Sequence, residues 1–157
     1  MKRLFAITLV CVAALLSASH ANAQKYGVIG GVTFPSVASE EGGSQVGWNA
    51  GGTVQFTLPL GFAVQPSLVF DSRLEGVQLP VSLQWGPDLL VFRPYFDVSP
   101  YVGYSFSGQK GFEYGVGLGG GIEVWHLQVS CRYNWNLESV VNNYRGVTLS
   151  LAFLFGK

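Results

Sequence analysis

Charged residues are scarce in this chain of 157 residues. They make up 11% of the sequence, whereas soluble domains carry about 25%. An exported soluble domain would need a more strongly charged surface, so the shortage indicates surroundings that are not only water. Basic runs are also absent, and the nine basic residues are balanced by nine acidic ones. The sequence therefore predicts no nucleic-acid partner.

Cysteine is nearly absent as well. One of the two cysteines, Cys11, lies in an N-terminal apolar run, "LFAITLVCVAALLSA", behind the basic Lys2 and Arg3. The small residues "ANA" at 21–23 complete the pattern of a secretory signal peptide. We predict a signal peptide over 1–23 and a single domain over 24–157. A transmembrane helix or a lipoprotein anchor fits less well, because the run is short and no small-residue pocket precedes Cys11.

That domain retains only Cys131, so it cannot form the internal disulfide with which small exported domains are often stabilised. Helical periodicity is missing too, since no window places apolar residues at i, i+3, i+4 and i+7 over three turns. Strict alternation recurs instead, which is the period of a β-strand. In "VQLPVSLQW", every second residue from Val77 to Trp85 is apolar. Similar segments occur near 25–34, 48–58, 62–70, 77–85, 95–106, 112–124, 127–136 and 146–155.

The connections between these segments alternate in length and polarity. "PLG" and "WH" are short, and "GPDLLVFRP" is longer than either. The other connections are polar: "PSVASEEGGSQ", "DSRLEG", "SGQKG" and "NLESVVNNY". The pattern predicts an all-β fold, an eight-stranded antiparallel up-and-down barrel with short turns at one end.

One face of each segment is bulky and apolar, and the other is small and polar. The lumen of an eight-stranded barrel is just wide enough for side chains to fill, so we predict that the small, polar face points inward. Four charged residues fall on that face, and we expect them to form a lumenal polar network: Asp97, Glu113, Glu123 and Arg132. Glu123 and Arg132 lie on consecutive segments, so we expect them to pair. This network is interpreted as a plug that holds the barrel shape, with a narrow selective passage as the alternative.

Aromatic residues gather near the ends of the segments, as in the interfacial girdles of outer-membrane barrels. The long-loop end has Trp48, Phe70, Phe106, Phe112, Trp135 and Tyr144. The short-turn end has Phe62, Trp85, Phe96, Trp125 and Phe155. A transmembrane barrel in the bacterial outer membrane with both termini in the periplasm is therefore predicted. A secreted, lipocalin-like barrel that binds a small apolar ligand is the alternative from another class.

"GVGLGG" at 115–120 matches the dinucleotide-binding pattern G-x-G-x-x-G. That pattern counts only where a strand runs into a helix, and here another strand segment follows. We predict instead that the alternate glycines face the lumen and leave room for larger neighbours such as Tyr101 and Arg132.

Several stretches resemble the PorT-like outer-membrane β-barrel family common in Bacteroidetes: "LPVSLQW", "RPYFDVSPYVGYSF" and "GVGLGGGIEVWHLQVSCRYNWNLESV". The resemblance covers nearly all of 24–157 and implies an eight-stranded barrel, similar to those of OmpX and OmpA, with an outer-membrane location and no specific activity. The ending "VTLSLAFLF" resembles the Phe-terminated strand that the barrel-insertion machinery recognises, although Gly156 and Lys157 follow Phe155.

Candidate catalytic and metal-binding residues are few. His126 is the one histidine of 24–157 and lies in the shortest turn, while Cys131 is isolated on the apolar face. We therefore predict no catalytic residues, no metal and no cofactor. The expected partners are membrane lipid, lipopolysaccharide and, through the last strand, the insertion machinery, and we expect a monomer. The acidic stretch at 39–45 is interpreted as a solvated loop rather than a contact site.

Overall fold

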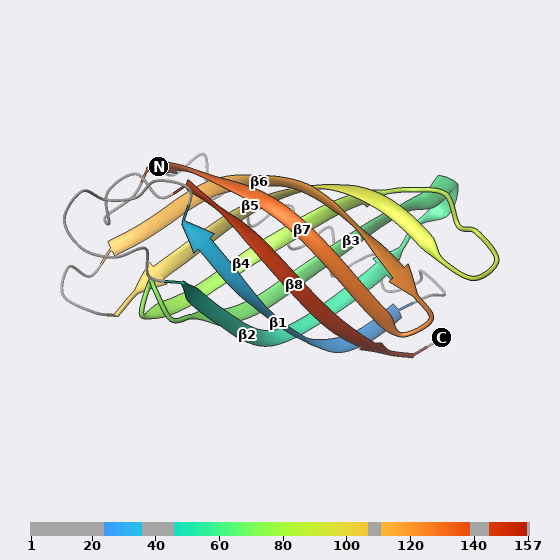
Figure 1. Cartoon of the computed structure of the whole chain (residues 1–157), viewed down its shortest axis with the longest axis horizontal. Helices are drawn as coiled ribbons and strands as arrows, with labels where there is room; N and C mark the ends of the chain where they lie inside the picture. Colours follow the sequence, from blue (N-terminus) through green and yellow to red (C-terminus); the bar gives the residue numbers. More distant parts are fainter. Residues whose placement is uncertain (1–23, 36–45, 107–110, 139–144, 157) are drawn as a thin grey trace.

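The computed structural model describes residues 24–35, 46–106, 111–138 and 145–156. Strands make up nearly all of this part of the chain (Figure 1). The predicted segments agree with the strands to within two residues at every boundary. The bounds are β1 (Gln24–Pro35), β2 (Gly47–Thr57), β3 (Phe62–Asp71), β4 (Gly76–Trp85), β5 (Arg93–Ser105), β6 (Gly111–Val124), β7 (Leu127–Glu138) and β8 (Arg145–Phe155).

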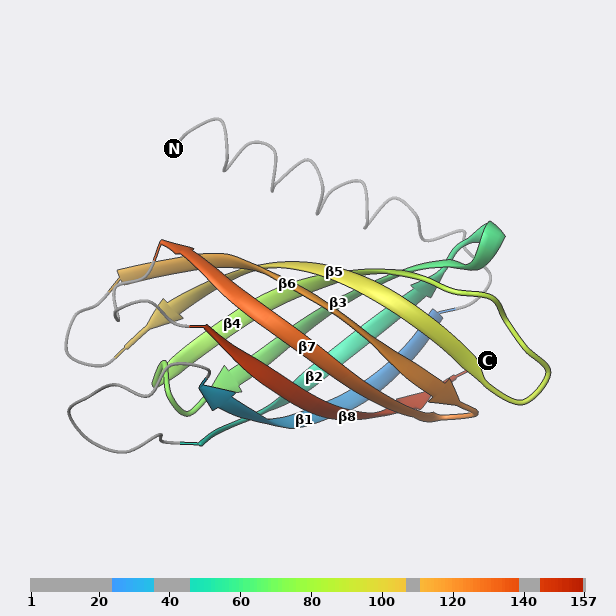
Figure 2. The ribbon, with the colours of Figure 1, turned by 45° about the horizontal axis from the view of Figure 1, so that its top comes forward.

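Each strand pairs antiparallel with its neighbour in sequence, and β1 also pairs with β8, so the sheet closes into a barrel. Figure 2 shows the strongly tilted strands wrapping around one axis. A closed ladder satisfies backbone hydrogen bonds within the sheet and leaves no strand edge. The predicted all-β fold is confirmed. No described residues form a helix long and apolar enough to cross a membrane.

The two ends of the barrel differ. At the short-turn end lie a 3-10 turn, Pro59–Gly61, the 86–92 loop and the two-residue turn at Trp125 and His126. The start of β1 and the end of β8 lie at this same end, on the right of Figure 1. The long-loop end carries the 72–75 turn and the strand ends that flank 36–45, 107–110 and 139–144. These three ranges, which include the acidic stretch 39–45 and Tyr144, lie outside the described residues. The predicted signal peptide, 1–23, is also outside them.

Side chains alternate between the two faces of the wall as predicted. The bulky apolar set points outward and is exposed on every strand, whereas most buried side chains are polar. One member of the outward set, Val64, is buried because it lies between its cross-strand partners Phe56 and Leu83. The interior also holds a large apolar side chain, Leu154, which follows the inward parity of Ala152 and is fully buried.

Three prolines interrupt the ladder in the middle of the wall. Pro66, Pro80 and Pro100 lie inside β3, β4 and β5, and proline has no amide hydrogen to donate. The β3–β4 pairing has a gap just beyond Pro66, and the β4–β5 pairing has one just beyond Pro80. Closure of the barrel tolerates these gaps because the strands remain paired on both sides of them.

The glycines of β6 serve close packing in the lumen. "GVGLGG" lies inside β6, which continues into β7 rather than into a helix, so it is not a dinucleotide loop. A Cβ at Gly115 would stand 2.4 Å from the Tyr101 hydroxyl, and one at Gly117 would stand 2.4 Å from Arg132 Cδ. The predicted role of these glycines, to make room for Tyr101 and Arg132, is confirmed.

Gly119 offers the sharpest test of this packing. A Cβ there would stand 2.2 Å from the Cys131 carbonyl oxygen and 2.7 Å from Arg132 Cα, which are backbone atoms that cannot move aside. We expect Gly119→Ala to destabilise the barrel by about 1–3 kcal/mol, as overpacking does. At the outward Gly52 the nearest atom would be 3.9 Å away, so Gly52→Ala should be neutral or slightly stabilising. Urea unfolding in detergent micelles measures both, and equal effects would contradict the packing argument.

Candidate functional site: the polar interior

A layer of polar side chains crosses the lumen near the short-turn end. We call it the lower cluster, and all but β8 contribute to it: Lys25, Gln55, Gln65, Gln84, Arg93, Glu123 and Gln128. Apart from Lys25 they are buried. An inward position on seven of the eight strands is thus polar at similar depth, so the layer reaches from one side of the wall to the other.

Glu123 is the centre of the charged part of this cluster. The ammonium group of Lys25 donates to Glu123 Oε1, and Gln55 Nε2 donates to Glu123 Oε2 at 3.1 Å. Arg93 Nη1 lies 3.5 Å from the same Oε2. A buried carboxylate is costly unless it is paired and hydrogen-bonded, and here two cations and an amide surround it. These contacts compensate the negative charge of Glu123 and connect β6 to β1, β2 and β5 across the lumen.

Glutamine amides form the rest of the lower cluster. Gln84 Nε2 donates to Gln65 Oε1 at 2.5 Å, and Gln65 Nε2 donates to Gln128 Oε1 at 3.0 Å. Gln55 Nε2 also donates to Gln84 Oε1 at 3.2 Å. An amide group is both donor and acceptor, so each glutamine can pass the chain of hydrogen bonds on. The result is a connected network, which rigidifies an interior when its members are satisfied.

A second ion pair lies in the middle of the barrel. Arg132 Nη2 is 2.6 Å from Asp97 Oδ2, and Arg132 Nε donates to the same oxygen at 2.9 Å. Arg132 Nη2 also donates to Ser82 Oγ at 2.8 Å. Gly119 is the cross-strand partner of both Asp97 and Arg132. Because Gly119 has no side chain, Arg132 on β7 reaches across β6 to Asp97 on β5.

The expected pair of Glu123 with Arg132 is not formed. The tight turn after Val124 sets the register of β6 and β7, so Glu123 lies opposite Gln128, and Arg132 lies opposite Gly119. Arg132 is therefore four residues farther from the turn than a partner of Glu123 would be. Glu123 on β6 pairs instead with Lys25 on β1 and Arg93 on β5. Arg132 on β7 pairs with Asp97 on β5.

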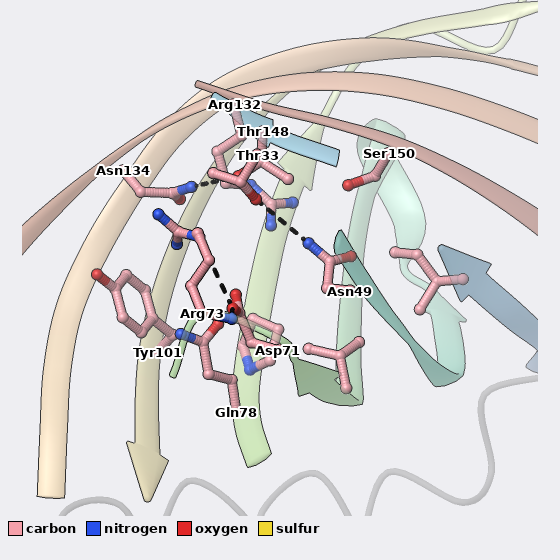
Figure 3. Close-up of a pocket in the computed structure, with 13 residues that line it drawn as sticks. Thr33, Asn49, Asp71, Arg73, Gln78, Tyr101, Arg132, Asn134, Thr148 and Ser150 are labelled. Carbon is pink, nitrogen blue, oxygen red and sulfur yellow. Dashed lines mark hydrogen bonds and ion pairs between the residues drawn. The ribbon is translucent and has the colours of Figure 1, made fainter. Parts of the chain in front are cut away.

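Toward the long-loop end the interior opens into a cavity of about 50 Å³. Figure 3 shows Arg73 and Tyr101 on one side of it and Asn49 and Ser150 on the other. The carboxylate of Asp71 lies 3.8 Å from Arg73 Nε and accepts a hydrogen bond from the Arg73 amide at 2.9 Å. The cavity is large enough only for water, because one water needs about 10–15 Å³ of such volume.

Glu113, the fourth predicted member of the network, lies near this end. Asn136 Nδ2 donates to Glu113, and the Tyr101 hydroxyl donates to the amide oxygen of Asn136. Nearby, Asn134 Nδ2 donates to Thr148 Oγ1 at 2.8 Å, and Thr148 shares a 3.0 Å hydrogen bond with Thr33. The structure thus places all four predicted residues in the lumen but divides them among three levels rather than one cluster.

Several members of the lower cluster were not among the predicted site residues. The four glutamines fall on the small, polar face of their segments, which predicts an inward position, but amides alone give no reason to expect a cluster. Lys25 lies on a glycine-rich segment, in which alternation does not define the two faces. Arg93 lies in the stretch "GPDLLVFRP", which the pattern predicts to be a connection. The charge of Glu123 is the one available signal, because a buried carboxylate requires cations nearby.

The described aromatic residues of the predicted girdles lie near the strand ends, and His126 and Cys131 lie apart from the polar interior. The described members of the two predicted girdles lie at the two ends of the barrel, and Tyr144 lies outside the described residues. Trp48 packs against Phe70 with 5.8 Å between ring centroids. His126 is in its turn, 6.0 Å from the Phe153 ring, and Cys131 is exposed on the outer face. Among the described residues, no cluster of three or more His, Cys, Asp or Glu could hold a metal.

Comparisons with known proteins support the architecture. No protein-family model matches the chain, and no curated protein matches it. Among solved structures, Neisserial surface protein A is similar, with a TM-score of 0.59, 17% identity and coverage of 83% of this chain and 95% of that one. The N-terminal β-barrel domain of Pseudomonas aeruginosa OprF is also similar, with a TM-score of 0.56, 12% identity and coverage of 83% of this chain and 97% of that one.

A third similar structure belongs to a set of de novo designed transmembrane β-barrels, with a TM-score of 0.53, 12% identity and coverage of 85% of this chain and 96% of that one. At such low identities these likenesses concern the fold alone. They show that this chain has the fold of eight-stranded membrane barrels.

The pair of Asp97 and Arg132 should contribute strongly to stability. Asp97 is 1% exposed, and removing one partner of a buried pair costs about 3–5 kcal/mol. We expect Asp97→Asn and Arg132→Met each to lower the free energy of unfolding by roughly that amount. Combined, they should cost less than the sum of the two, because no unpaired charge remains.

Arg145→Met is the matched control, since Arg145 is exposed at the start of β8. Its effect on urea unfolding in detergent micelles should be within about 0.5 kcal/mol. An Arg132→Met barrel as stable as the Arg145→Met barrel would refute a stabilising role for the pair.

Proposed function

We propose that this chain is a bacterial outer-membrane β-barrel with a structural or surface-contact role, a plugged polar lumen and no enzymatic activity. Both termini would lie in the periplasm, which is the side expected for the short-turn end. The observation that carries the proposal is the distribution of charge. In the described strands, outward positions between the two aromatic ends carry no charged side chain, while Asp97, Glu123 and Arg132 point inward.

Lipid contact explains this distribution better than water does. An Arg or Lys on the lipid face costs about 2–4 kcal/mol at the bilayer midplane, whereas in water the same residue would improve solubility. The exposed side chains include Leu68, Leu83, Leu118 and Leu151 on four different strands. A continuous apolar surface around a barrel is a liability for a soluble protein.

The interior argues against the soluble alternative. A secreted barrel that binds an apolar ligand needs an apolar lumen, and the described lumen is filled with amides, hydroxyls and ion pairs. The same filling supports a plug over a narrow passage, because the lower cluster crosses the barrel. Catalysis has little support, since His126 lies in an exposed turn next to Phe153 rather than beside a nucleophile.

Two finer elements belong to the proposal. Membership of the PorT-like family is supported by the three quoted stretches, which form much of β4 to β7. Recognition by the insertion machinery is supported by β8, which is apolar on its outward face and ends at Phe155. Outer-membrane lipid and lipopolysaccharide are the proposed surroundings of a monomeric barrel.

Cell fractionation of the producing bacterium tests the proposal. We expect the processed chain in the outer-membrane fraction, released only by detergent. We also expect an unboiled sample to migrate differently from a boiled one on a denaturing gel, because a closed barrel resists detergent unfolding. Recovery of the chain from the periplasm without detergent, with no shift on boiling, would contradict it.

A further inference from the structure

Each turn at the short-turn end presents a large apolar side chain to the outside. Leu60 in the Pro59–Gly61 turn is 86% exposed, and Trp125 in the β6–β7 turn is 78% exposed. Leu90 in the 86–92 loop is fully exposed, and Val91 beside it is 60% exposed. We call these four residues the apolar crown. The three turns lie at the same end of the barrel, on the right of Figures 1 and 2.

The backbone at two crown positions does not favour these residue types. Leu60 has φ 66° and Trp125 has φ 56°, both in the left-handed region. Glycine and asparagine are the residues that adopt this region most readily. A bulky apolar side chain there adds strain and, in water, gains nothing from its exposure. Such outliers persist where the surrounding structure holds them in place, and they cluster at functional positions.

The 86–92 loop is built to present its apolar tip. The Leu89 amide donates to the Phe92 carbonyl oxygen at 3.2 Å, which closes a tight turn with Leu90 and Val91 at its apex. The charge nearest to the tip is paired, because Asp88 Oδ1 lies 3.2 Å from Arg93 Nε, although the Asp88 side chain is 65% exposed. The apex therefore carries four consecutive apolar residues, 89–92, and no free charge.

The position of the crown favours one kind of occupant. Each turn adjoins an outward apolar side chain of a strand: Leu60 precedes Phe62, Phe92 precedes Phe96, and Trp125 follows Val124. Leu90, Val91 and Trp125 also border the open mouth of the lumen, beside Lys25 and Glu123. The three turns are spread along the rim from β2 to β7 instead of forming one flat patch. A surrounding lipid layer touches such a rim everywhere at once, and tryptophan is enriched at the boundary of headgroups and acyl chains.

We infer that the apolar crown is immersed in the membrane leaflet around the short-turn end, so that these turns do not project into the aqueous periplasm. The inference rests on the proposed function, because it requires a membrane barrel. It places Lys25, Arg93 and Glu123, just inside the mouth, at the level of the lipid headgroups. It also assigns the lipid surface, rather than a protein partner, as the occupant of the crown.

Tryptophan quenching in liposomes tests this depth. One chain retains only Trp125, with the other three tryptophans changed to Phe, and a second retains only Trp85 as the belt reference. A third carries Leu90→Trp and a fourth carries Glu75→Trp, each with all four native tryptophans changed to Phe. Glu75 lies in the exposed turn at the opposite end, so the fourth chain is the aqueous reference. The liposomes contain phosphatidylcholine brominated on the acyl chain near its carboxyl end, and iodide is the quencher in water.

We expect brominated lipid to quench the Trp125-only and Leu90→Trp chains as strongly as the Trp85-only chain. Iodide should quench only the Glu75→Trp chain well. If Trp85 is quenched by lipid while the two crown chains are quenched by iodide, the crown is in water and the inference is wrong, although the membrane barrel stands. If brominated lipid quenches none of the chains, both the inference and the proposed function are wrong. Heat-modified gel migration verifies that each chain has folded.

Discussion

The closure of one antiparallel ladder is the constraint from which the other features follow. Once β1 pairs with β8, most backbone polar groups of the strands find partners within the wall, and every side chain must point either outward or into a narrow lumen. The lumen of such a barrel admits only side chains, so small and polar residues fill it. The bulky apolar residues are left on the outside. A structure with this distribution is stable where the outside is lipid.

The interior is organised by charge as well as by size. Glu123 forms ion pairs with Lys25 and Arg93 near the short-turn end, and Asp97 forms one with Arg132 in the middle. These contacts join strands that are far apart in the sequence, such as β1 and β6. The inward glycines of β6 make this possible, because Arg132 lies over Gly117 and Gly119. The same residues that looked like a nucleotide-binding motif are thus part of the packing of the lumen.

The strand pattern could be predicted from the sequence because the period of two is local. The apolar Trp85 is exposed on the outer face, whereas its polar neighbour Gln84 is buried in the lumen. The partners of the charged residues could not be predicted in the same way. The two-residue turn after Val124 places Gln128 opposite Glu123, and this register excludes a direct cross-strand pair of Glu123 with Arg132. The contact of Lys25 with Glu123 depends on the curvature of the closed barrel, which no single segment encodes. Arg93 follows an apolar stretch that does not alternate, so the sequence predicts a loop there, but β5 begins at this residue.

The environment of Cys131 tests the central claim most directly, namely that the outward face meets lipid. Cys131 lies on the outer face near the middle of β7 and is the one cysteine of residues 24–157. A nitroxide spin label on this native thiol, in the chain reconstituted into liposomes, reports collisions with lipid-soluble oxygen and with a water-soluble nickel chelate. The account predicts frequent collisions with oxygen and few with nickel. A label relaxed mainly by the nickel chelate would contradict it.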